Sequence, residues 1–140
     1  HDNKTIEVTT SSNDSSAKNI LDFNCDSCYT AEANKNAWIC FDFKNRKVKV
    51  TGYSIKSHKN GKNEHQLKSW IIEISNNGQT WEKIDEHTNC PTLNGHCITG
   101  TFHVQPNDFS RYVRLFQTDE PWGGHALWFH YIEFYGYLRE

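Results

Sequence analysis

The chain of 140 residues is long enough for one domain with a single hydrophobic core, and its 15 Lys and Arg against 17 Asp and Glu give a net charge of -2. The cations are spread along the sequence, which argues against a nucleic-acid-binding face, and no apolar run is long enough to span a membrane. Aromatic residues make up 14% of the chain, so we expect large rings to fill much of the core.

Polar, irregular sequence occupies residues 1–36. Hydrophobic alternation at 5–9 predicts a short opening strand, and 19–36 is predicted to be a long loop anchored by a few buried side chains. We expect residues 1–140 to form one domain, in which residues 1–4 are disordered or vector-derived. Because the chain starts with His rather than Met, we also expect it to be part of a larger multidomain protein.

Short runs with strong β propensity follow one another through the rest of the chain, and none has the periodicity of an amphipathic helix. The sequence Asn76-Asn77-Gly78 predicts a hairpin with a type I′ turn, because Asn and Gly tolerate positive φ angles. About eight strands separated by turns are typical of an all-β, antiparallel β-sandwich or jelly-roll barrel. The predicted strands after the opening one lie at 37–43, 47–56, 69–75, 80–85, 97–104, 111–117 and 129–137.

An ordered set of motifs resembles a discoidin domain, also called a coagulation-factor type C domain, over nearly the whole chain. The resemblance implies a galactose-binding-domain-like fold and is closest to the intracellular discoidin domains that accompany BTB-type domains. Secreted members join their two ends through a disulfide, and neither end of this chain carries a Cys. The motifs are WICFDF at 38–43, YSIKS at 53–57, SWIIEISNNGQTW at 69–81, RYVRL at 111–115 and IEFYG at 132–136.

Discoidin domains bind carbohydrate, anionic lipid or protein, generally through loops at one end of the barrel. The resemblance therefore implies a binding module, and fold alone does not choose the ligand. We predict recruitment of a protein partner through these loops, with carbohydrate binding through the same loops as the alternative. No nucleophile elbow, phosphate-binding loop or metalloprotease helix is present, so we predict that the domain is not an enzyme.

The strongest candidate for ligand contact is Trp122, which lies in a Gly-rich loop outside any strand pattern. Such a Trp offers a rigid aromatic surface to a sugar ring or a protein pocket, and the alternative is a ring folded back over the rim of the barrel. Loops at 57–68 and 19–36 are predicted to supply further walls. The predicted ligand-binding residues are Trp122, His125, His58, Lys59, Asn63, His65 and Tyr29, with Lys35 and Asn36 near Tyr29.

No cofactor is predicted to be required, but several discoidin relatives bind a structural calcium ion near the first loop. The resemblance suggests an equivalent site here, because the first loop carries carboxylate and amide oxygens of the kind that Ca²⁺ prefers. The spacing departs from the Asp-Gly-Asn/Asp pattern of those relatives. The candidate calcium ligands are Asp22, Asn24, Asp26 and Ser27, with Glu133 approaching from the last strand.

Five cysteines are present, at positions 25, 28, 40, 90 and 97. An odd count favours reduced thiols in an intracellular, cytoplasmic protein, and two disulfides with one free thiol in an extracellular protein are the alternative. A zinc site is disfavoured because only Cys25 and Cys28 form a pair with ligand spacing.

Overall fold

The computed structural model describes residues 6–10, 29–33, 37–57, 61–64, 66–123, 126–129 and 131–139. Within these ranges the chain forms strands and no helix. The described residues therefore contain no membrane-spanning helix. The strands are β1 (Glu7–Thr10), β2 (Tyr29–Ala33), β3 (Trp38–Asp42), β4 (Lys47–Lys56), β5 (Trp70–Ser75), β6 (Glu82–His87), β7 (Thr99–His103), β8 (Tyr112–Gln117), β9 (Ala126–Phe129) and β10 (Tyr131–Arg139).

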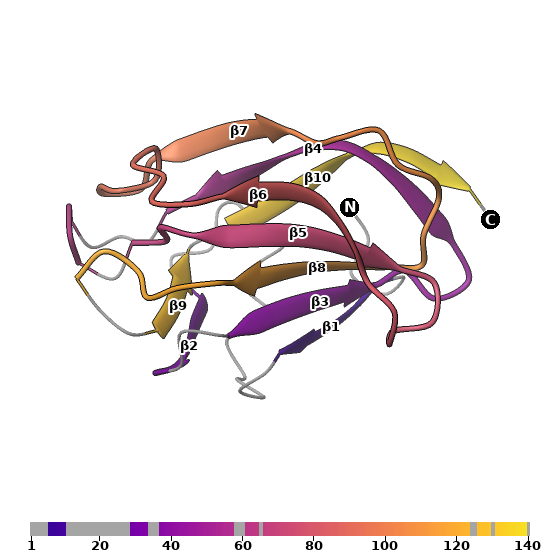
Figure 1. The fold of residues 1–140 in the computed structure, drawn as a ribbon, viewed down its shortest axis with the longest axis horizontal. Helices are drawn as coiled ribbons and strands as arrows, with labels where there is room; N and C mark the ends of the chain where they lie inside the picture. The colour runs from indigo at the N-terminus through magenta and orange to yellow at the C-terminus, as the bar shows by residue number, and fades with distance from the viewer. Residues whose placement is uncertain are drawn as a thin grey trace.

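The strands form three antiparallel sheets. A five-stranded sheet has the order β1-β3-β8-β5-β6, a three-stranded sheet has the order β10-β4-β7, and β2 pairs with β9. Figure 1 shows the strands of the two larger sheets running along the length of the molecule, with β2 and β9 near one end. The predicted all-β, antiparallel sandwich of about eight strands is confirmed, because the two larger sheets together hold eight.

Two local predictions need correction. The predicted loop at 19–36 contains strand β2, which forms because β9 pairs with it from a distant part of the chain. The hairpin between β5 and β6 is confirmed, but its connection spans 76–81 and is longer than a type I′ turn. The Asn77 side chain explains the length, since its Oδ1 accepts hydrogen bonds from the backbone N–H groups of Gln79 and Thr80, each at 2.8 Å.

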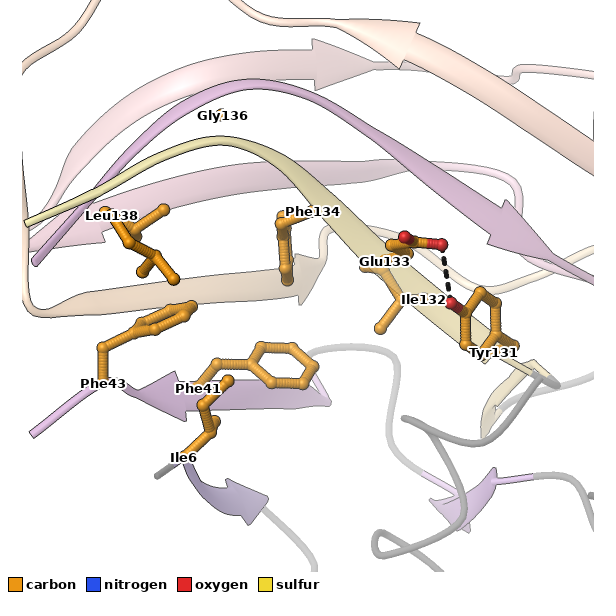
Figure 2. A pocket seen from close by; sticks show the side chains of 10 residues that line it. Ile6, Phe41, Phe43, Tyr131, Ile132, Glu133, Phe134, Gly136 and Leu138 are labelled. Carbon is orange, nitrogen blue, oxygen red and sulfur yellow. Dashed lines mark hydrogen bonds between the residues drawn. The ribbon is translucent and has the colours of Figure 1, made fainter. Parts of the chain in front are cut away.

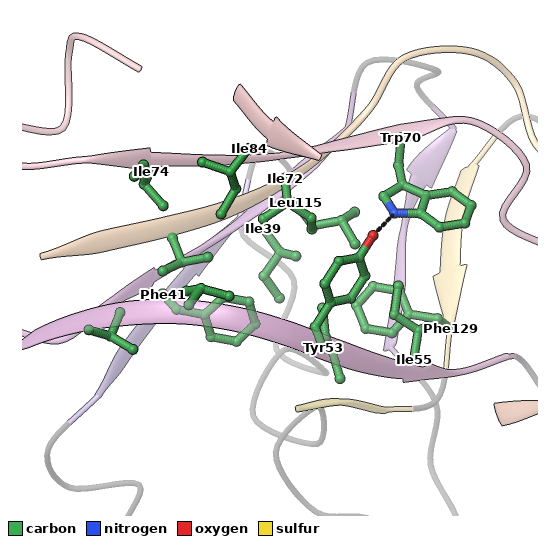
Figure 3. Close-up of a cluster of buried hydrophobic side chains, with 14 of the residues drawn as sticks. Ile39, Phe41, Tyr53, Ile55, Trp70, Ile72, Ile74, Ile84, Leu115 and Phe129 are labelled. Atoms are coloured by element: carbon green, nitrogen blue, oxygen red, sulfur yellow. Dashed lines mark hydrogen bonds between the residues drawn. The ribbon is translucent and has the colours of Figure 1, made fainter. Parts of the chain in front are cut away.

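The core lies between the two larger sheets and follows the period-2 alternation of their strands. In β8, Val113 and Leu115 are fully buried, while Arg114 between them lies on the outer face. Burial of each such apolar side chain stabilises the fold by about 1.5–3 kcal/mol. Figure 3 shows inward side chains of both sheets meeting in this layer. Other fully buried core residues include Ile39, Phe41, Tyr53, Ile55, Trp70, Ile72, Ile84, Phe129 and Ile132.

A buried hydrogen-bond chain joins the two sheets. The indole N–H of Trp70 donates to the hydroxyl of Tyr53 at 2.8 Å, and that hydroxyl donates to Asp85 Oδ2 at 2.6 Å (Figure 3 draws the first bond). His87 Nε2 lies 2.9 Å from the same carboxylate oxygen. Burial, together with the hydrogen bond to Asp85, raises the pKa of Tyr53 far above its ordinary value, so its hydroxyl stays protonated.

Asp42, the last residue of β3, makes the stability of the fold depend on pH. Burial raises the pKa of its carboxyl, but hydrogen bonds from Arg111 and from the Lys44 N–H outweigh burial and hold that pKa below its ordinary value. A lowered folded-state pKa stabilises the fold above the unfolded pKa near 3.8, and this contribution is lost as the pH falls through the lower folded value.

We therefore expect Asp42→Asn to lower the free energy of unfolding at pH 7 and to flatten its decline below pH 4. Urea unfolding at pH 7, 4 and 3 measures both effects. Glu82→Gln, which removes an exposed carboxylate, is the matched control and should reproduce the wild-type curve. Parallel pH curves for wild type and Asp42→Asn would contradict this assignment.

A candidate ligand-binding pole

Three connections between strands meet at one end of the sandwich. They join β4 to β5, β6 to β7 and β8 to β9, and Figure 1 shows them at the left end of the molecule. Their described residues are 57, 61–64, 66–69, 88–98 and 118–123, and we call this surface the loop pole. The connections meet because Trp70, at the start of β5, pairs with Gln117 at the end of β8 and with His87 at the end of β6.

Trp122 joins all three connections of the loop pole. Its backbone N–H donates to the Gln66 carbonyl at 2.8 Å, and the Gln66 N–H donates back at 3.3 Å. Its indole N–H donates to the Cys90 carbonyl at 3.3 Å. The indole is therefore anchored along its polar edge, yet its side chain stays only half-buried. An anchored, half-exposed ring has the rigidity that an aromatic contact surface needs.

A cation lies next to this ring. Lys68 Nζ lies over the Trp122 ring, 5.1 Å from its centroid, at a distance where ammonium and indole attract each other. Lys68 is half-buried and belongs to the last residues before β5. An aromatic face, an ammonium donor and neighbouring amides are thus gathered on one surface.

The amides come from two different connections. The Asn63 backbone N–H donates to Asn94 Oδ1 at 2.7 Å, and Asn94 Nδ2 donates to Asn63 Oδ1 at 2.9 Å. Asn63 has a φ of 60°, and Gly123, beside Trp122, has a φ of 70°. A Cβ at Gly123 would overlap the Asn63 carbonyl oxygen, so the two connections touch through their backbones.

The structure brings some predicted ligand-binding residues together. Trp122 and Asn63 both lie in the loop pole, and Tyr29 lies in β2 opposite Phe129 of β9, while the ligand-binding role of all three stays a prediction. Residues His58, Lys59, His65 and His125, and also Lys35 and Asn36, lie outside the described residues.

The sequence-based prediction missed the wall formed by residues 88–98. Asn94 and Lys68 contact the predicted residues directly, but no sequence signal assigned either side chain a role. Asn94-Gly95 has the composition of an ordinary turn, and such a composition does not show which distant segment the turn contacts. This part of the candidate site can be recognised only from the tertiary structure, which shows that the connections are neighbours.

The calcium prediction is not tested by the described residues. Asp22, Asn24, Asp26 and Ser27 lie outside them, and Glu133 is exposed on β10, where its Oε1 accepts a 2.6 Å hydrogen bond from the Tyr131 hydroxyl. In the described ranges, no group of three or more His, Cys, Asp or Glu side chains could hold a metal ion. Calcium therefore stays a prediction.

The described cysteines are all free thiols: Cys40 is buried, while Cys90 and Cys97 are half-buried. Burial raises the pKa of the Cys40 thiol to about 11, which keeps it unreactive at neutral pH. Cys25 and Cys28 lie outside the described residues, so the redox state of the chain and its predicted cytoplasmic location stay predictions.

A separate cavity of about 160 Å³ lies between the sheets, where β10 faces β1 and β3. Figure 2 shows apolar side chains such as Phe41, Phe43 and Phe134 around it, with Tyr131 and Glu133 hydrogen-bonded to each other at one side. This lining offers few polar groups to sugar hydroxyls. The loop pole, which offers several, is the better candidate for polar ligands.

The sequence pattern of the F5/8 type C domain matches residues 5–134. The chain belongs to the F5/8 type C domain family. This confirms the predicted discoidin-like domain. The narrower prediction of an intracellular, BTB-associated kind finds no support in the comparisons with known proteins.

Solved structures similar to this F5/8 type C domain include modules from Clostridium perfringens. CpGH89CBM32-6 is 22% identical with a TM-score of 0.71, covering 95% of this chain and 94% of its own. CpGH89CBM32-5, in complex with GalNAc-β-1,3-galactose, is 12% identical with a TM-score of 0.75, covering 95% and 96%. The family 32 carbohydrate-binding module of NanJ, in complex with galactose, is 12% identical with a TM-score of 0.72, covering 94% and 93%. At these identities the likeness shows a shared fold.

Proposed function

We propose that this F5/8 type C domain is a non-catalytic carbohydrate-binding module that holds a glycan at the loop pole beside Trp122. Protein recruitment was the first prediction from the sequence, and carbohydrate binding was its alternative. The alternative is the better supported, because the similar structures are carbohydrate-binding modules, two of them in complex with galactose-containing or galactose ligands. Similar modules also occur within larger chains, such as one joined to an alginate lyase domain.

The single observation that carries this proposal is the anchored Trp122 ring with polar groups around it. The apolar face of a sugar ring packs on an indole, and its hydroxyls accept from ammonium and amide donors. Here the ammonium is Lys68, and Asn63 and Asn94 supply side-chain amides on the same pole. These groups come from three connections that are hydrogen-bonded to one another, so little conformational entropy is lost when a ligand binds.

The non-catalytic part of the proposal rests on the family and on the position of the cavity. Glycoside hydrolysis needs two carboxyl groups that converge on a cleft. The 160 Å³ cavity lies between the sheets and contains one carboxylate, Glu133, which is already bonded to Tyr131. A surface loop site with an aromatic platform is suited to binding rather than bond cleavage.

We expect wild-type protein to bind galactose- or N-acetylgalactosamine-terminated glycans on a glycan array, and Trp122→Ala to lose at least tenfold in affinity. A tenfold loss corresponds to about 1.4 kcal/mol of binding free energy. Titration calorimetry with the best array ligand gives the dissociation constants, and circular dichroism checks that the variant is folded.

Trp81→Ala is the matched control, because Trp81 is another half-buried Trp but lies in the β5–β6 hairpin at the opposite end. It should bind the glycan as the wild type does. Equal affinities for wild type and Trp122→Ala would refute a role for the loop pole. If no glycan on the array binds and the domain instead captures a protein in a Trp122-dependent way, protein recruitment would be favoured.

A further inference from the structure

The pairing of β4 with β10 gathers positive charge at the end opposite the loop pole. Val48 and Val50 of β4 are buried, so the alternating Lys47 and Lys49 face outward. Lys47 pairs directly with Arg139, and Lys49 pairs with Tyr137. Figure 1 places the end of β10 and the start of β4 at the right, away from the connections of the loop pole.

The three cations of this surface lack acidic partners within the described ranges. Like charges directly opposite each other on paired strands are destabilising, and Lys47 and Arg139 are such a pair. None of the ion pairs between described residues involves Lys47, Lys49 or Arg139. The Arg139 guanidinium instead lies over the Phe109 ring, 4.2 Å from its centroid. Among the described residues, this surface therefore carries positive charge that no carboxylate pairs with.

Aromatic rings accompany these charges. Tyr135 and Tyr137 share the outer side of β10 with Arg139, two residues apart along the strand and hence roughly 7 Å apart. Their exposures are 40% and 64%, which makes them two of the few large hydrophobic side chains open to solvent in the described structure. The Tyr135 hydroxyl is held 2.8 Å from Ser54 Oγ, so this ring has a fixed position on the sheet.

We propose that the outer surface formed by Lys47, Lys49, Tyr135, Tyr137 and Arg139, here called the β4–β10 face, binds an extended acidic polysaccharide. Flat tyrosine rings suit the faces of successive sugar residues, and the cations suit their carboxylates. A bilayer is a poorer match, because these side chains lie along two paired strands and not on a projecting apolar loop. This site is separate from the proposed loop-pole site and does not depend on it.

The test measures binding of polygalacturonate, with neutral galactan as the uncharged comparison, by affinity electrophoresis at low and physiological salt. We expect wild type to prefer polygalacturonate and to lose affinity as salt rises, since the charges are exposed. Lys49→Gln and Arg139→Gln should each weaken binding about threefold to tenfold at low salt, and the double variant more. Lys83→Gln, which removes an exposed charge paired with Glu86 elsewhere, should have little effect.

Equal weakening by Lys83→Gln and Lys49→Gln, or no preference for polygalacturonate over galactan, would overturn the proposal. Tighter binding to phosphatidylserine vesicles than to polygalacturonate, lost in the double variant, would assign the face to membranes and also overturn it. Trp122→Ala should leave polygalacturonate binding intact. The two proposals can therefore fail separately. Polygalacturonate binding can confirm the β4–β10 face even if no neutral glycan binds the loop pole, and its absence can refute the face even if a neutral glycan does bind there.

Discussion

Replacement of Gly123 by alanine is expected to abolish glycan binding at the loop pole while the sandwich stays folded. Gly123 has a φ of 70°, which costs an alanine about 1 kcal/mol. The larger effect is steric, because the new Cβ would overlap the carbonyl oxygen of Asn63. The backbone of one connection must then move away from the other. This movement would break the bonds that join Trp122 to Gln66 and Asn63 to Asn94.

The control for this experiment is Gly78→Ala in the β5–β6 hairpin. Gly78 has a nearly identical φ of 75°, but a Cβ there would lie 3.6 Å from the nearest atoms of Tyr112, an ordinary contact. Both variants therefore carry the same conformational cost, and only Gly123→Ala carries the overlap. Calorimetric titration should show binding by Gly78→Ala and none by Gly123→Ala. Unchanged affinity in Gly123→Ala would mean that the ligand does not use the contact between these connections.

We expect Tyr53→Phe to destabilise the fold by about 2 kcal/mol. The Tyr53 hydroxyl accepts from the Trp70 indole N–H and donates to Asp85, and neither Tyr53 nor Trp70 is exposed. Removing the hydroxyl leaves the buried indole N–H without its acceptor, and an unsatisfied buried donor costs about 1–3 kcal/mol. For a domain of this size, the melting temperature should fall by roughly 7 °C.

Tyr112→Phe is the matched control, because the Tyr112 ring is half-buried on the outer face of β8 and contacts Arg111 and Trp81 through its ring. Removing its hydroxyl should change the free energy of unfolding by less than about 0.5 kcal/mol. Urea denaturation of the three proteins measures both values. A loss in Tyr53→Phe no larger than that in Tyr112→Phe would show that the buried hydrogen-bond chain contributes little to stability.

Part of the candidate site could be predicted from the sequence. Trp122 is an aromatic residue next to glycine and outside any strand pattern, which can be recognised in the local sequence. The structure places it in the loop pole. Asn94 and Lys68 carry no such signal, because Asn in a turn and Lys before a strand are ordinary. Their importance comes from contacts with residues about 31 and 54 positions away along the chain, namely Asn63 and Trp122.

The sequence by itself determined most of the strands, although not β2, and it determined which side is buried in the strands where apolar and polar residues alternate. Val113 and Leu115 face the core and Arg114 faces outward because side chains alternate across a strand. This alternation can be recognised from the order of consecutive residues. Only the tertiary structure decided which connections meet. Trp70 pairs with Gln117 on one side and His87 on the other, and this order brings three distant loops together. A period of two residues fixes the face of a strand but not its neighbours, so strand order depends on the packing of the whole core.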